Sequence, residues 1–278
     1  MNQRTRMQIA QWIMRILIVF FTALFLYPLF WNVMSSFKTN EEFLRSQTAF
    51  PQGFAIDNYV RAFQKANVGA YFFNSVFVVV LSTCFLLAFI VPTSYTLARF
   101  RFPFSRVIEN IYMTCLFVGA PLVPLYLLLF RMHMTNSLFW ISFYYAISSF
   151  PFTIFLLSGY MRSIPKSYAD AAYIDGCGNW NILLRIIVPL AGSGIATVTM
   201  LSAMGYWNEY VLALVLLRDE AIKTLPVGIA YLYAVQKRAT DFGALFAALV
   251  IVLVPTIGIY LAGQKALLKG IGVGGIKE

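Results

Sequence analysis

Long stretches without a charged residue recur along the chain, and the charged residues gather between these stretches. Apolar side chains fill both odd and even positions within them, as in residues 245–253, which favours helices over half-polar strands. A helix needs about 20 apolar residues to cross the hydrocarbon core of a membrane. Six stretches are long enough: 16–37, 66–98, 110–130, 132–161, 186–208 with a continuation to 217, and 242–264. The pattern predicts an all-α polytopic membrane protein with six transmembrane helices.

Positive charges between the stretches indicate the orientation of the chain. Arg4 and Arg6 precede the first stretch as in a signal peptide, but no small-residue cleavage site follows and the stretch is too long. We therefore expect a retained helix. The turn after the second stretch carries Arg99, Arg101 and Arg106 and no acid, which is typical of a cytoplasmic turn. With six spans, both termini are then expected in the cytoplasm.

The composition agrees with a membrane protein. The chain has 278 residues, of which 60% are hydrophobic and only 12% charged, whereas soluble domains carry about 25% charged residues. The net charge of +10 fits contact with anionic lipid headgroups, and no basic run is long enough to indicate a nucleic-acid partner. Only three cysteines and one histidine, His133, are present, so we expect neither a disulfide scaffold nor a metal site.

The polar segment between the fourth and fifth spans predicts a short helix outside the membrane. Ser167 is a suitable N-cap, and Asp170 would lie in the first turn, where the helix dipole favours an acid. Asp175 and Gly176 would end this helix, because glycine adopts the left-handed conformation that a sharp stop needs. Asn179 is a suitable N-cap for the next helix.

One face of this short helix could enter a cleft of a partner protein. Tyr168, Ala171 and Ala172 occur at positions i, i+3 and i+4, so we expect an aromatic ring beside two methyl groups on one face. An amphipathic connector at the membrane interface would show the same pattern, and the pattern alone slightly favours that connector.

The segment resembles the EAA loop of ABC-importer permeases, whose pattern is E-A-A-x-x-D-G-A followed by I-x-x-P-L. The matching residues are Asp170-Ala171-Ala172, Ile174-Asp175-Gly176 and Ile187-Val188-Pro189-Leu190. Other motifs resemble the carbohydrate-uptake, maltose-type branch: Ser36-Phe37-Lys38-Thr39, Ala98-Arg99-Phe100-Arg101-Phe102-Pro103, Pro124-Leu125-Tyr126, Trp207-Asn208-Glu209-Tyr210 and the tail from Lys269 to Lys277. Together they cover nearly the whole chain.

The resemblance implies a type I ABC-importer permease fold, with residues 1–278 as a single transmembrane permease domain and residues 163–185 as its coupling loop. Such a subunit of a bacterial or archaeal inner membrane passes a carbohydrate, here expected to be an oligosaccharide, that an extracytoplasmic solute-binding protein delivers. Its other partners would be a second homologous permease and a cytoplasmic ABC ATPase dimer, which binds ATP and Mg. This subunit would hold no cofactor. The implied ATPase-coupling residues are Tyr168, Asp170, Ala171, Ala172, Ile174, Asp175 and Gly176.

Three departures from the family pattern affect this loop and the span after it. Asp170 stands in place of the usual glutamate, and Cys177 in place of alanine. Ser193 stands where the family often has a second proline, so we expect a straighter start to the fifth span.

Other classes of protein fit the sequence less well. The chain has no G-x-x-x-x-G-K-[ST] phosphate loop and no plausible Ser-His-Asp set, so we expect neither an enzyme nor catalytic residues. An ion-coupled secondary transporter remains an alternative, but only Glu209 lies within a span, with Glu109 at an edge. A phosphate-bearing cargo would favour Lys or Arg in the middle of the spans, where the sequence has none.

Aromatic and polar residues of the fourth and fifth spans are candidates for contact with a sugar, because aromatic rings pack against sugar CH groups and polar side chains bind hydroxyls. The candidates are Tyr144, Tyr145, Tyr206, Trp207, Asn208, Glu209 and Tyr210. Residues near the outer membrane interface would show the same composition, and this alternative is somewhat favoured for Glu209. The outer loops 38–65 and 218–241 are either connections or a platform for an external protein.

Overall fold

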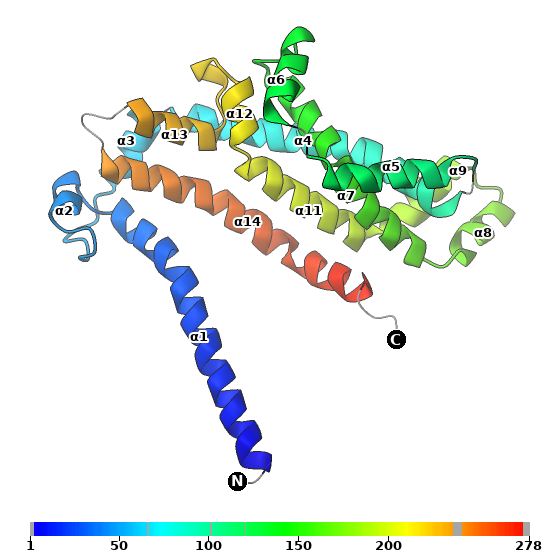
Figure 1. Ribbon diagram of the computed structural model, residues 1–278, viewed down its shortest axis with the longest axis horizontal. Helices are drawn as coiled ribbons and strands as arrows, with labels where there is room; N and C mark the ends of the chain where they lie inside the picture. Colours follow the sequence, from blue (N-terminus) through cyan, green and yellow to red (C-terminus); the bar gives the residue numbers. More distant parts are fainter. Residues whose placement is uncertain (1–2, 66, 101, 120, 236–240, 275–278) are drawn as a thin grey trace. The chain divides into compact units, whose positions relative to one another are not determined.

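The computed structural model describes residues 3–65, 67–100, 102–119, 121–235 and 241–274, and every regular element in them is a helix (Figure 1). Four single helices are long and apolar enough to cross a membrane: α1 (Gln3–Ser36), α4 (Val68–Arg99), α7 (Leu138–Ser163) and α14 (Phe242–Gly274). Two bent pairs also qualify if each is one span: α5 (Ser105–Phe117) with α6 (Leu122–Arg131), and Asn179–Leu190 with α11 (Gly192–Asn208). The all-helical prediction is confirmed, with up to six spans.

Short helices connect these spans. They are α2 (Asn40–Arg45), α3 (Asp57–Lys65), α8 (Ser167–Ile174), α9 (Asn179–Ile182), the π-helix η1 (Leu183–Ile187), α10 (Val188–Leu190), α12 (Val211–Leu216), the 3-10 helix η2 (Glu220–Ile222) and α13 (Leu225–Val235).

The chain divides into two compact units, which are described separately. The first unit comprises Met1–Val68 and Ile229–Leu253, and the second comprises Gly69–Gly228 and Val254–Glu278. Because α13 and α14 each run from one unit into the other, the units share continuous helices. The single permease domain remains a prediction.

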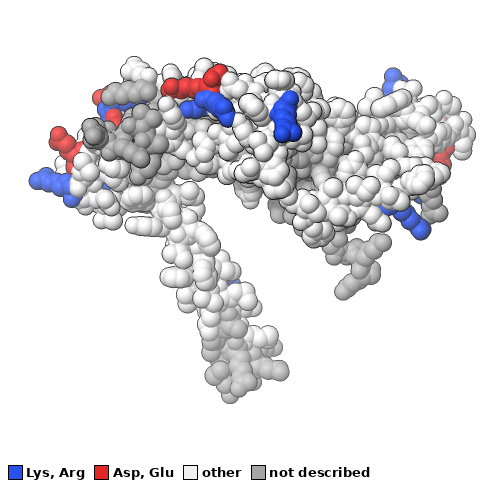
Figure 2. Space-filling view, turned by 45° about the horizontal axis from the view of Figure 1, so that its top comes forward, with Lys and Arg blue, Asp and Glu red and all other residues white. Residues whose placement is uncertain are grey.

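In the first unit, α1 exposes its apolar side chains. None of the residues in its most apolar window is buried, and Figure 2 shows the helix as an almost unbroken surface without charge outside its grey tip. Near its C-terminal end α1 packs against other elements, and the ring centroid of Trp31 lies 5.2 Å from that of Phe246 on α14. Phe43 of α2 packs on the same ring at 4.9 Å, so three elements meet there.

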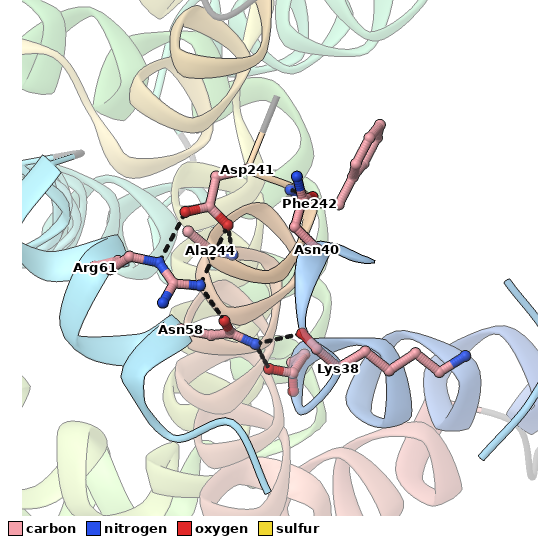
Figure 3. A network of polar contacts seen from close by, with 8 residues as sticks. Lys38, Asn40, Asn58, Arg61, Asp241, Phe242 and Ala244 are labelled. Atoms are coloured by element: carbon pink, nitrogen blue, oxygen red, sulfur yellow. Dashed lines mark hydrogen bonds and ion pairs between the residues drawn. The ribbon is translucent and has the colours of Figure 1, made fainter. Parts of the chain in front are cut away.

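A polar network holds the first unit together beside these aromatic rings (Figure 3). The Nδ2 of Asn58, which is fully buried, donates to the carbonyl oxygens of Ser36 and Lys38 at 2.7 and 2.8 Å. Arg61 pairs with Asp241, and the Oδ1 of Asn40 accepts a hydrogen bond from the backbone N–H of Phe242. The network therefore ties the end of α1 and the helix α3 to the beginning of α14.

Lys38 is buried at the end of α1 without an ion pair among the described residues. Its Nζ donates to the carbonyl oxygens of Ser46 and Gln47 at 3.2 and 2.9 Å, which closes the loop after α2. Burial lowers the pKa of the Lys38 ammonium, and the nearby Glu42 carboxylate partly opposes this shift. Lys38 of the Ser-Phe-Lys-Thr motif thus fixes the conformation of the loop after the first span.

In the second unit, α7 lies in the core and contacts both α5 and α11. Ile141, Ile154, Leu157 and Met161 of α7 are each at most 3% exposed. A β-carbon at Gly194 of α11 would lie 2.6 Å from Cγ of Tyr160, so glycine allows this close packing.

The expected straighter start of the fifth span is wrong. The segments Asn179–Leu190 and Gly192–Asn208 are bent by 78° at Ala191, whose ψ of 5° departs from helical geometry. Pro189 remains just before the bend, and the π-helix η1 loosens the helix further upstream. The fifth span therefore starts with a bend although a serine stands at position 193.

Candidate functional site

The predicted short helix outside the spans is α8, Ser167–Ile174, which follows the end of α7. It lies with α9 at one end of the second unit, in the right-hand part of Figure 1. Ala169 and Ala172 are 6% and 5% exposed and belong to the core of this unit, where α8 contacts η1. The helix is thus attached to the start of the fifth span by one face.

The outer face of α8 is apolar and open. Tyr168 is 50% exposed, and Ile174 is 87% exposed at its end. Ala171 lies between them at helical spacing and is also exposed. Ala172 is not part of this face, which corrects the expected pairing of Ala171 with Ala172: the core, rather than a partner, covers its methyl group.

Both predicted N-caps are displaced by one residue. Lys166 rather than Ser167 precedes the first helical residue of α8, and Gly178 rather than Asn179 precedes that of α9. The Oδ1 of Asn179 instead accepts a hydrogen bond from the hydroxyl of Tyr173. This bond joins α8 to α9 across the turn.

The predicted stop at Asp175 and Gly176 is confirmed. Gly176 has a φ of +79°, and its N–H donates to the carbonyl oxygen of Tyr173. The N–H of Cys177 then reaches back to the carbonyl of Ala172 at 2.9 Å, which is typical of a helix end closed by a left-handed residue. Asp170 lies exposed in the first turn, as expected.

A second feature is a cavity of about 370 Å³ between α7 and α11. Its lining combines two tyrosines with small polar and apolar residues: Tyr145, Ser148, Ser149, Phe152, Leu201, Ser202, Gly205, Tyr206, Glu209 and Leu212. The rings of Tyr145 and Tyr206 stack with centroids 5.7 Å apart and planes inclined by 7°. The Tyr206 hydroxyl donates to Oγ of Ser149 at 3.0 Å. Aromatic faces and hydroxyls therefore meet in one cavity, and none of the described residues that line it is cationic.

Glu209 is held at the edge of this cavity by three hydrogen bonds. Its carboxylate accepts from the backbone N–H groups of Leu212 and Ala213 at 2.8 and 3.0 Å, and from the hydroxyl of Tyr145. The first two bonds satisfy the N-terminus of α12. Glu209 thus positions Tyr145 and α12, and this satisfies an acid that would otherwise be costly within a span.

The other predicted path residues do not line this cavity. Trp207 is buried against Phe72 of α4, with ring centroids 5.8 Å apart. Asn208 bonds the Met204 carbonyl of its own helix, Tyr144 packs on the core, and the exposed Tyr210 precedes α12. Five further lining residues were not predicted from the sequence: Phe152, Leu201, Ser202, Gly205 and Leu212. Spacing could have indicated Ser202, which lies four residues before Tyr206 on one helix face.

Comparison with known proteins identifies the chain. Residues 85–272 match the family described as "Binding-protein-dependent transport system inner membrane component". The chain belongs to this family. The protein is therefore an inner-membrane permease of the ABC type and not an enzyme. The resemblance to ABC-importer permeases is confirmed, and this assignment takes the place of the ion-coupled secondary transporter.

Named relatives and a solved structure extend this assignment over almost the whole permease. The chain is 33% identical to the "Diacetylchitobiose uptake system permease protein NgcG" of Streptomyces coelicolor, over 93% of this chain and 86% of that protein. It is 30% identical to the "Multiple sugar-binding transport system permease protein MsmG" of Streptococcus mutans, over 91% and 92% of the two chains. A crystal structure of a bacterial ABC transporter involved in alginate import aligns with a TM-score of 0.85 and 25% identity, covering 95% of this chain and 98% of that one.

Proposed function

We propose that this permease imports an oligosaccharide delivered by an extracytoplasmic solute-binding protein, and that α8 couples the import to a cytoplasmic ATPase. The observation that carries the proposal is that one face of α8 is buried and the opposite face is exposed. Ala169 and Ala172 attach it to the core, while Tyr168 and Ile174 remain open for a partner. Because α8 is attached by one face to the start of the fifth span, a movement of the ATPase against its exposed face would be transmitted to that span.

The ATPase would bind ATP and Mg and would close on α8 from the cytoplasm. The orientation follows from charge, because Arg99, Arg106, Arg162 and Lys166 gather around one hollow beside the segment that leads to α8. Positive residues favour the cytoplasmic side, so this end of the second unit would face the cytoplasm, with both termini on the same side of six spans. A second, related permease would complete the pathway.

Two observations support a sugar cargo. The relatives named above carry diacetylchitobiose or multiple sugars in their names, and the aligned transporter imports alginate. The cavity between α7 and α11 offers the ring faces of Tyr145 and Tyr206 together with the hydroxyls of Ser148, Ser149 and Ser202. Such a lining suits the CH faces and hydroxyl groups of a saccharide. Because none of the described lining residues is cationic, the cavity disfavours a phosphate-bearing cargo.

Substitutions at Ala171 test the coupling. Ala171→Glu adds bulk and charge to the exposed face, whereas Ala171→Ser keeps a small side chain at the same position. We expect the glutamate variant to insert normally but to lose ATPase stimulation by a loaded binding protein, and the serine variant to retain it. The measurement is ATP hydrolysis by the reconstituted transporter, with sugars tested one at a time. Full stimulation in Ala171→Glu would contradict the coupling role of α8.

A further inference from the structure

A separate hollow of about 640 Å³ lies where α4 ends and α5 begins. The last turn of α7 and the residue before α8 complete its wall. Its lining consists of Leu97, Ala98, Arg99, Phe100, Phe102, Phe104, Ser105, Arg106, Val107, Glu109, Arg162 and Lys166. Four of these side chains are cationic and one is acidic, so the hollow has an excess of positive charge.

Much of this positive charge is not neutralised by the residues that the structure describes. Arg162 pairs with Glu109, but Arg106 and Lys166 form no ion pair with any residue that the structure describes. Arg99 is fixed, because its Nη2 donates to the carbonyl oxygen of Ile164 at 2.7 Å. Its Nε is buried and has no hydrogen-bond partner among the described residues. A buried guanidinium N–H without an acceptor is costly, but Nε has no accessible surface, so an anion in the hollow would bind the outer N–H groups of Arg99.

The backbone adds a second reason for an anion at this place. Ser105 begins α5, a helix of 13 residues, and the preceding Phe104 provides no side-chain cap. The first N–H groups of a helix attract anions, most of all phosphates. Phe104 also has a φ of +71°, an unfavourable conformation for a bulky side chain, and its ring is 75% exposed. Strained backbone of this kind is frequent at binding sites.

We propose that this hollow binds a phosphate group, presented either by an anionic phospholipid or by free phosphate. Arg99, Arg106 and Lys166 would contact the phosphate oxygens together with the N-terminus of α5. Arg99 is the last residue of the candidate span α4, a position expected near the level of lipid headgroups. The exposed rings of Phe100 and Phe104 would then lie against the lipid beside its headgroup. The site is distinct from the cavity between α7 and α11 and does not depend on the cargo.

A paired set of variants tests the site in the full-length protein, purified in detergent with the subunits that accompany it. The double variant Arg106→Gln/Lys166→Gln removes the two unpaired cations, both of which are exposed and outside the core. The control, Arg185→Gln/Lys265→Gln, removes two exposed cations of the same unit that do not line the hollow. Native mass spectrometry counts bound phosphatidylglycerol and phosphatidylcholine at increasing lipid concentration. Gel filtration shows whether each variant keeps its fold. A second control, Arg106→Lys/Lys166→Arg, keeps both positive charges and changes only the side chains.

We expect Arg106→Gln/Lys166→Gln to bind phosphatidylglycerol about 30-fold more weakly, because it removes one positive charge from each of two contacts with the headgroup. The control and the charge-conserving variant should bind like the original protein. Displacement of the lipid by inorganic phosphate would identify free phosphate as the source, and persistence would identify the lipid. Equal binding of phosphatidylcholine, or an equal loss in the control, would overturn the proposal, because either result indicates unspecific attraction.

Discussion

Nε of Arg61 lies 2.8 Å from Oδ2 of Asp241, although 180 positions separate the two residues along the chain. The same aspartate accepts a hydrogen bond from the N–H of Ala244 at 3.1 Å, so it also caps the first turn of α14. Arg61 in turn donates to Oδ1 of Asn58, whose amide group holds the carbonyls at the end of α1. The ion pair thus joins α3 to α14, and the hydrogen bonds of Asn58 extend the network to the end of α1.

Asp241 should stabilise the first unit through both its charge and its cap. Asp241→Ala removes both, and we expect a loss of about 1–2 kcal/mol, since the pair is partly exposed and a lost cap costs about 1 kcal/mol. Asp241→Asn keeps an oxygen for the Ala244 N–H and should lose less. Thermal unfolding of the detergent-solubilised protein measures both effects. Arg45→Met, at an exposed arginine without a described ion pair, is the control, and an equal loss there would contradict the role of the pair.

Gly243 should resist substitution because of the buried Asn58. A β-carbon there would lie 2.6 Å from Oδ1 of Asn58, whereas a β-carbon at Gly258 of the same helix would meet no atom within 4 Å. We expect Gly243→Ala to lower the unfolding temperature and Gly258→Ala to maintain or raise it, because alanine favours a helix by about 1 kcal/mol over glycine. A higher unfolding temperature for Gly243→Ala would show that Asn58 moves without cost.

The sequence predicted four of the spans as single helices, because apolar composition is a local property. The apolar stretch 16–37 lies in α1 except for its last residue, 132–161 lies largely in α7 and 242–264 lies in α14. The stop at Gly176 needed only the conformational freedom of glycine. These features arise within a few neighbouring residues, so no tertiary information was required.

Features that depend on packing were missed. Ala172 and Ala171 are equally small, and only contact with the core decides which of them faces a partner. The bend at Ala191 follows Pro189 and the π-helix η1, and the apolar pattern of the span does not show that π-helix. The lining of the cavity joins residues of α7, α11 and α12, and the Arg61–Asp241 pair joins residues that no local pattern relates.

Glu209 should matter chiefly for the shape of the cavity. Glu209→Ala would leave the Leu212 and Ala213 N–H groups and the Tyr145 hydroxyl without their acceptor, so we expect a loss of about 2–4 kcal/mol. Tyr145→Phe removes one of the three bonds and should cost about 1–2 kcal/mol. Asn208→Ala is the neighbouring control, because Asn208 bonds only a carbonyl of its own helix among the contacts described. Thermal unfolding that ranks Asn208→Ala with Glu209→Ala would contradict this role.

The turn after α8 should determine whether the coupling helix transmits movement. Gly176 has a φ of +79°, so Gly176→Ala forces an unfavourable left-handed alanine that costs roughly 1–2 kcal/mol at this position. Gly178, two residues later, has a φ of −73° that alanine accepts readily, and neither position lacks space for a methyl group. Backbone conformation is therefore the main difference between the two variants. We expect Gly176→Ala to reduce ATPase stimulation by a loaded binding protein while Gly178→Ala retains most of it, with equal amounts of both proteins in the membrane. Equal stimulation in the two variants would mean that the turn adapts to ATPase closure, and that the left-handed glycine serves only to end the helix.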